Sequence, residues 1–166
     1  MLIYHPAFDA YHCVFRMLAV AEGGGELEVD KARLLDFYLL FPAAVALIRL
    51  PANLRDGRKF AKAATNLYHD PLNPFVTFRD MRHIQEAALK CIAGSGLIDV
   101  GRLDAGFVRR TDTDIPGQLR DKVDEFLEVR QPIADIVLKG LAAIPLRGPD
   151  GLKHRTELME YKYDVA

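Results

Sequence analysis

The sequence predicts a mainly α-helical fold with a small β-hairpin, in the form of a winged helix-turn-helix-like domain with additional C-terminal helices. Apolar residues recur at helical spacing along most of the chain, and half of the 166 residues are apolar, which is enough for a substantial core. The segment GSGLIDVGRLDAGFVRRT (94–111) is typical of a helix end followed by two short strands. We therefore expect residues 1–114 to form the winged-helix-like domain and residues 115–166 to form a helical extension and tail.

Two helices near the start of the chain are expected to carry much of the core. Pro6 suits the first turn of a helix that should end at the three glycines at 23–25 and turn inward Phe8, Tyr11, Phe15 and Leu18. A second helix is predicted from an N-cap at Asp30 through residues 31–41. Its run LLDFYLLF (34–41) is apolar almost all round, so this helix should be buried on several sides.

The middle of the chain predicts shorter elements. A short helix over 42–50 is followed by a second one over 56–69, whose expected inward face is Phe60, Ala64 and Leu67. Prolines at 71 and 74 predict a loop, with a short strand at 75–78. A helix over 81–93 with Asp80 as its N-cap should come next, and its predicted core face is Ile84, Ala87, Ala88, Cys91 and Ile92.

The predicted wing follows the helix over 81–93. A helix that ends in Gly-Leu-Ile and leads into a hairpin is typical of the wing of a winged-helix domain. After Pro116, an amphipathic helix is expected to turn Leu119, Val123 and Phe126 inward, and Pro132 should end or kink it. A further helical segment is predicted over 133–143, and LMEYKY (158–163) is expected to form a last short element.

Charge is balanced over the whole chain and clustered at one place. The formal net charge is −1, so the chain as a whole does not attract nucleic acid or membrane. One basic cluster, with Asp56 as its lone acid, contains Arg49, Arg55, Arg58, Lys59 and Lys62, and the presumed wing carries Arg109 and Arg110. These side chains are candidates for contact with DNA phosphates or with a protein partner. The alternative is an ordinary solvated helix face.

The two cysteines and the longest apolar run point to a soluble, cytoplasmic protein. Cys13 and Cys91 lie in apolar helical patterns and are expected to be buried thiols in a reducing compartment rather than a disulfide. The longest apolar run, residues 37–48, contains Pro42 and is shorter than the roughly 20 residues that a bilayer requires. No signal peptide is recognised, because charged and polar residues interrupt the first apolar segment.

The opening stretch YHPAFDAYHCVFR (4–16) raises the question of a metal or catalytic site. The spacing of Asp9, His12 and Cys13 would let their side chains bind one metal ion from the same helix. A stable zinc site needs four donors, or three and a water, and the remaining histidines are scattered. A core helix is the favoured interpretation. Because Ser95 lies in a helix terminus and no phosphate-binding loop is present, we predict no catalytic, metal or cofactor-binding residue and a non-enzymatic protein.

Two segments resemble a known family. YHPAFDAYHCVFRML (4–18) and RLLDFYLLFP (33–42) are similar to the start of middle components of bacterial ABC-three-component systems, a group that includes the Lamassu-type anti-phage systems. The resemblance continues more loosely to Thr111. It implies a small winged-helix accessory subunit that acts between an SMC- or Rad50-like ABC ATPase and an effector, often a nuclease. It offers no catalytic residue or cofactor.

A stand-alone winged-helix transcription regulator is the alternative, and an enzyme comes third. A regulator usually has a strongly basic recognition helix, whereas the helix over 81–93 carries only Arg82, His83 and Lys90 against Glu86. The apolar helices beyond the predicted wing favour an adaptor with protein partners, because they exceed what one modest domain needs to cover. The sequence therefore favours the accessory subunit, with DNA contacted through the complex.

Overall fold

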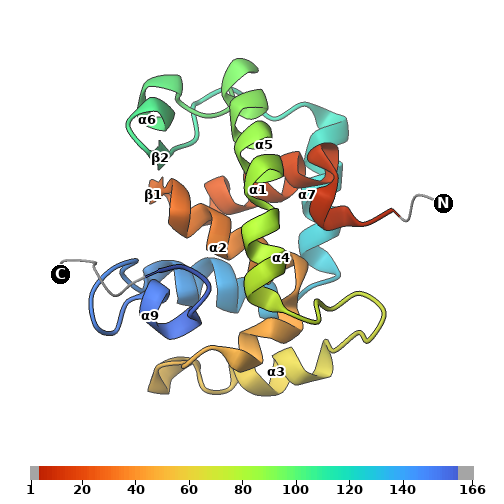
Figure 1. Cartoon of the computed structure of the whole chain (residues 1–166). Coiled ribbons are helices and arrows are strands. Elements are labelled where there is room, and N and C mark those ends of the chain that lie inside the picture. Colours follow the sequence, from red (N-terminus) through yellow and green to blue (C-terminus); the bar gives the residue numbers. More distant parts are fainter. Residues whose placement is uncertain (1–3, 161–166) are drawn as a thin grey trace.

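The computed structural model describes residues 4–160 and is mainly helical, with one small antiparallel sheet, as predicted (Figure 1). The helices are α1 Ala10–Gly24, α2 Val29–Leu40, α3 Gly57–Ala63, α4 Pro74–Asp80, α5 Arg82–Gly94, α6 Val100–Asp104, α7 Gly117–Glu128, α8 Ile133–Asp135 and α9 Leu152–Thr156. The strands are β1 Leu27–Glu28 and β2 Phe107–Val108. Shorter helical turns are η1 Pro6–Phe8, η2 Pro42–Leu47, η3 Ala52–Leu54, η4 Ile136–Gly140 and η5 Leu141–Ala143.

The first helix starts later than predicted. Pro6 opens the separate turn η1, and Asp9 then caps α1 by accepting a hydrogen bond from the backbone N–H of His12 at 3.0 Å. The change of direction leaves Phe8 and Tyr11 exposed, so their predicted place in the core is wrong. Phe15 and Leu18 are buried as predicted, because they lie beyond the cap on the face that α1 turns to the body.

The second helix forms the centre of the molecule. α2 begins at Val29, and Asp30 lies in its first turn rather than at its N-cap. Each residue over 31–40 is buried, which confirms the prediction of burial on several sides. α1, η2, η4 and η5 all pack against this helix, and α5 packs along α1 (Figure 1). α2 is therefore the element around which the rest of the chain is arranged.

The predicted hairpin is present, with a helix in its loop. The backbone N–H of Asp99 donates to the carbonyl of Arg109 at 2.8 Å, and that of Thr111 donates to Leu97 at 3.1 Å. α6 occupies the loop because the Asp99 carboxylate caps it at the N–H of Arg102. β1, which the sequence did not predict, adds to β2 with Leu27 opposite Val108. The small sheet thus joins the start of α2 to the segment after α5.

Two predictions between residues 56 and 78 are wrong. α3 stops at Ala63, and its buried residues are Gly57 and Ala61, whereas Phe60 and Leu67 are exposed. The expected strand at 75–78 is the helix α4. Its start is well defined, because Asn73 accepts a hydrogen bond from the N–H of Val76 and Pro74 occupies the first turn.

The inward face of α5 is rotated from the predicted one. Ala88 and Ile92 are buried as expected, but Ala87 and Cys91 are exposed. Their places in the core are taken by Gln85, Leu89 and Ala93. The prediction that Cys91 is a buried thiol is therefore wrong, whereas Cys13 is buried, and both cysteines are free.

The C-terminal helices complete the core. α7 packs on α1 with Val123 and Phe126 buried as predicted, and the chain continues helically from Ile133 through Ala143 as α8, η4 and η5. Of the predicted element LMEYKY, residues 158–160 are irregular and residues 161–163 lie outside the described part. Within residues 4–160, none of the helices combines the length and hydropathy of a membrane span.

Candidate partner-binding surface

Four of the predicted contact residues lie together at one end of the molecule. Arg55 closes η3, and Arg58, Lys59 and Lys62 follow on α3, all of them exposed. Arg58 donates to the backbone carbonyl of Ile48 at 3.2 Å. Within residues 4–160, no acidic side chain lies within ion-pair distance of the other three. Their charges are consequently available to a partner.

Two further predicted contact residues follow β2, which lies at the opposite end of the molecule from α3 (Figure 1). Arg109 follows β2 and pairs with Asp99 at 3.2 Å and with Glu26 at 3.5 Å. Arg110 donates to the backbone carbonyls of Leu97 and Thr113. These two arginines thus stabilise the hairpin, and the structure does not bring them into one surface with the basic residues of α3.

The opening stretch serves the structure of α1. Asp9 caps the helix, and this hydrogen bond to the N–H of His12 is the main reason that the pKa of Asp9 is lowered. Cys13 points to the carboxylate of Asp36, with the sulfur 3.9 Å from Oδ2. In the part of the chain that is described, no group of three potential metal ligands is found together. Tyr4 and Tyr11 of this stretch are exposed.

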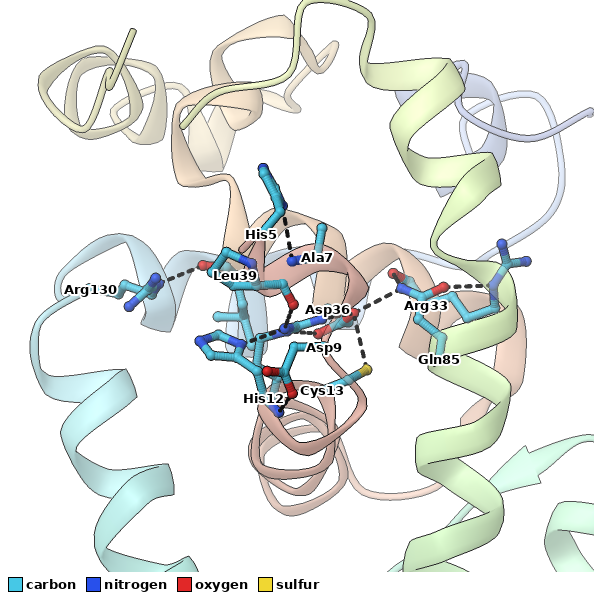
Figure 2. A network of polar contacts seen from close by, with 12 residues as sticks. His5, Ala7, Asp9, His12, Cys13, Arg33, Asp36, Leu39, Gln85 and Arg130 are labelled. Carbon is cyan, nitrogen blue, oxygen red and sulfur yellow. Dashed lines mark hydrogen bonds and ion pairs between the residues drawn. The ribbon is translucent and has the colours of Figure 1, made fainter. Parts of the chain in front are cut away.

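A buried ion pair between α1 and α2 is the main polar feature of the interior (Figure 2). Arg16 and Asp36 are both fully buried, with Nε 2.6 Å from Oδ1 and Nη2 3.2 Å from Oδ2. Gln85 of α5 donates to Asp36 Oδ2 at 2.8 Å and accepts from Arg33 Nε at 2.9 Å. Three helices are therefore joined by one hydrogen-bonded network.

Sequence reasoning missed this network, although a signal was available. Arg16 interrupts the apolar run VFRML and Asp36 interrupts LLDFYLLF. A charged residue on a helix that is buried all round must find an opposite charge or a full set of hydrogen bonds, because burying an isolated charge is very costly. Two such residues of opposite sign on neighbouring helices predict a pair.

The network acts as a scaffold. Arg16 also donates to the carbonyl of Pro6 at 3.0 Å and contacts Nδ1 of His12, so its polar groups are widely satisfied. Burial, with the charge of Arg16 as the next cause, lowers the pKa of His12 to about 4, so this ring is neutral at pH 7. Burial and then Asp36 raise the pKa of the Cys13 thiol, which makes it a poor nucleophile. These enclosed groups hold the helices together.

The loop between α3 and α4, residues 64–73, presents apolar side chains to solvent. Leu67, Tyr68 and Leu72 have relative exposures of 90%, 102% and 105%, so these side chains make almost no contact with the protein. Apolar side chains that gather on a protein surface usually mark a binding site. We call residues 64–73 the apolar loop.

The apolar loop is nevertheless ordered by its own polar groups. Asn66 donates its N–H to Asp70 Oδ2 at 2.7 Å, and its side-chain oxygen accepts from the N–H of Tyr68 at 3.1 Å. The ring of His69 stacks on that of His5, with centroids 5.1 Å apart and planes 4° apart, which fixes the loop to the body. Internal bonds of this kind are usual in compact surface loops that carry function.

A shallow hollow continues the apolar surface toward η2. Its volume is about 270 Å³, and small apolar residues, among them Ala43, Ala44, Pro71 and Pro74, line it. Leu47 stands at its edge with 72% of its surface exposed. The apolar loop and this hollow together form a surface suited to a protein partner.

A comparison with protein families identifies the family of this chain. The model of the family described as "ABC-three component (ABC-3C) system Middle Component 5", or MC5, matches residues 2–164. The chain belongs to this family. No curated protein and no solved structure matches it.

Membership of MC5 confirms the predicted family of ABC-three-component middle components. MC5 is an accessory family rather than a known enzyme family. A middle component implies further components of the same system, an ABC ATPase and an effector, as partners of the MC5 protein. The subtype of the system is not part of this match.

Proposed function

We propose that this protein is a non-catalytic accessory subunit that links an SMC- or Rad50-like ABC ATPase to an effector, such as a nuclease, in a cytoplasmic anti-phage complex of the Lamassu type. Membership of MC5 supports the accessory role. The resemblance of residues 4–18 and 33–42 to middle components of this kind supports the choice of system. The polar groups of the opening stretch are used in capping and in the buried network, which supports a structural rather than a chemical role.

The apolar loop is the observation that carries this proposal. Fully burying a leucine side chain contributes roughly 1.5–3 kcal/mol, so the two exposed leucines of this loop leave that free energy available to a partner. The loop is ordered before it binds, because Asn66 and Asp70 hydrogen-bond within it and His69 stacks on the body. Binding then costs little conformational entropy, which favours a stable complex.

We further infer a winged-helix-like organisation for residues 1–114, with residues 115–166 as its extension. This assignment is supported by the order of the elements: α5 comes first, then the pairing of 97–99 with 109–111, and β1 lies beside them. The exposed face of α5 does not favour a stand-alone regulator, because Arg82 is engaged by Glu86 at 2.9 Å. The basic residues of η3 and α3 are the better candidates for contact with DNA within the complex.

The accessory role is tested by co-expression with the ABC ATPase and the effector of the same three-component system. The three proteins should elute together in gel filtration, and a variant with Leu67→Asp, Tyr68→Ser and Leu72→Asp should leave the complex while keeping its own circular dichroism spectrum. Val100→Asp is the matched control, because Val100 is also exposed but lies on α6, away from the apolar loop.

Two results would show that the proposal is wrong. One is that the protein elutes as an isolated monomer when mixed with the ATPase, and the other is that deletion of its gene leaves phage resistance intact. Tight binding of the isolated protein to one operator sequence at physiological salt would instead support the regulator.

A further inference from the structure

Arg130 is held in a fixed position between two helix ends. It follows α7, and its Nε donates to the carbonyl of Leu39 at the end of α2 at 2.8 Å (Figure 2). Its Nη1 donates to the carbonyl of Phe126 at 3.4 Å, and its Cζ lies 3.7 Å from the centre of the Phe126 ring. A guanidinium at the C-terminal ends of two helices is favourably placed, because the last carbonyls of a helix carry partial negative charge.

The positive charge of Arg130 is nevertheless not neutralised. Over residues 4–160, no carboxylate lies within ion-pair distance of it, and its Nη2 has no hydrogen-bond partner in that part of the chain. Burial, followed by the nearby charge of Arg16, lowers the pKa of Arg130 to about 10. A guanidinium that is partly buried, held in place and left with free N–H groups is well placed to bind an anion. A carboxylate matches its geometry best.

Two hollows open on either side of Arg130. The first, of about 460 Å³, lies toward α3 and the apolar loop, with Phe60 and His69 among its lining residues. The second, of about 380 Å³, lies toward α1, with Tyr11 and Phe126 in its wall. Both hollows share Arg130 and its neighbour Val129, which is 72% exposed. We call the two hollows together the Arg130 cleft.

His12 adds a second donor to the Arg130 cleft. Its Nδ1 contacts Nη1 of Arg16, which can only donate, so Nδ1 is the acceptor. The neutral ring then carries its proton on Nε2, the ring nitrogen that does not contact Arg16. Because His12 lines the second hollow, its Nε2–H is available to an acceptor there.

The charges around the cleft favour a single carboxylate over a polyanion. Lys122 adds a second cation, but Glu125 lines the second hollow and Asp70 lines the first. These two acids would repel the successive phosphates of a nucleic acid, whereas one carboxylate can reach Arg130 without meeting them closely. Tyr11 and Phe126 offer an apolar wall to a neighbouring side chain.

We propose that the Arg130 cleft receives an acidic segment of the protein's partner, in which an Asp or Glu side chain pairs with Arg130 and an apolar neighbour lies between Tyr11 and Phe126. The proposal rests on the proposed function, since it specifies the chemistry of a partner that the accessory role requires. Asn66 and His69 of the apolar loop line the first hollow, so one partner segment can contact both surfaces.

Exposed Val129 offers a test that does not disturb folding. Val129→Glu places a competing carboxylate beside Arg130, and Val129→Gln is its uncharged control of the same size. Val129→Glu and Arg130→Ala should each weaken binding to the purified partner about 30-fold or more, because truncating a desolvated charge pair usually has an effect of this size. Val129→Gln should weaken binding much less than Val129→Glu does, because it adds no charge. Arg120→Ala should have little effect, since Arg120 is already paired with Glu22 and Asp124.

A small probe tests the carboxylate directly. Adding 3-phenylpropionate to the full-length protein should shift the NMR signals of the Arg130 Nε–H and the His12 ring, whereas 3-phenylpropionamide and inorganic phosphate should not. Equal shifts with the amide, stronger shifts with phosphate, or unchanged partner affinity in Val129→Glu would overturn the proposal. Loss of the complex on mutating the apolar loop, with no effect of Val129→Glu, would overturn the cleft alone. No partner binding by the wild type would overturn the accessory role itself.

Discussion

Replacing Asp36 by alanine would leave the guanidinium of Arg16 buried without its counter-ion. Both side chains are fully buried, and Asp36 accepts from Nε and Nη2 of Arg16 and from Nε2 of Gln85. Removing one member of such a pair costs about 3–5 kcal/mol, because the remaining charge keeps its desolvation penalty. Since domains of this size are stable by only about 5–15 kcal/mol, Asp36→Ala should remove a large part of the free energy of unfolding.

The double variant Arg16→Met, Asp36→Leu separates this cause from simple loss of volume. It removes both charges and fills the space with apolar atoms, so its stability should return to within about 1–2 kcal/mol of the wild type. Gln85 would retain its two hydrogen bonds with Arg33: its Oε1 accepts from Arg33 Nε at 2.9 Å, and its Nε2 donates to the backbone carbonyl of Arg33 at 3.1 Å. The assay is urea unfolding at pH 7, followed by far-ultraviolet circular dichroism.

A surface pair serves as the control. Asp80→Ala breaks the exposed pair with Arg79, whose Nε lies 3.1 Å from Oδ1, and should change the free energy of unfolding by no more than about 1 kcal/mol. The reasoning fails if Asp36→Ala behaves like this control. It also fails if the double variant is as unstable as the single one.

Three further predictions concern the opening helix and the basic cluster. Phe15→Ala should lower the free energy of unfolding by about 3–5 kcal/mol through lost burial and cavity formation. EDTA should leave the melting temperature of the wild type unchanged, and a large drop in that temperature would instead support a metal site. His12 has a pKa of about 4 in the folded protein against an ordinary 6.5, so the unfolded chain binds a proton at this ring first, and the free energy of unfolding should fall as the pH falls from about 6.5 to 4. When unfolding is measured at a series of pH values, His12→Gln should lose this part of the slope, and an unchanged slope would contradict the assignment. The isolated protein should bind short duplex DNA weakly and without sequence preference, and replacing Arg55, Arg58 and Lys59 by glutamate should flatten the salt dependence measured by fluorescence anisotropy.

The order of the main helices could be predicted from the sequence because their signals are local. The apolar periodicity of residues 10–24 and 117–128 lies within single helices, and the all-round apolar run at 34–41 predicted that α2 is buried on several sides. The family could be predicted from the first quarter of the chain for the same reason: segments 4–18 and 33–42 cover parts of α1 and α2, with Arg16 and Asp36 inside them.

Only the tertiary structure decided which polar residues are buried and which apolar residues are exposed. Gln85 faces inward although it is polar, because Asp36, which lies 49 positions earlier in the chain, accepts its hydrogen bond. Leu67 faces outward although it is apolar, because α3 ends at Ala63 and the loop then folds on its own polar groups. Spacing along a helix describes one face of that helix alone, whereas burial depends on what lies opposite, and that is set by contacts between segments far apart in the sequence.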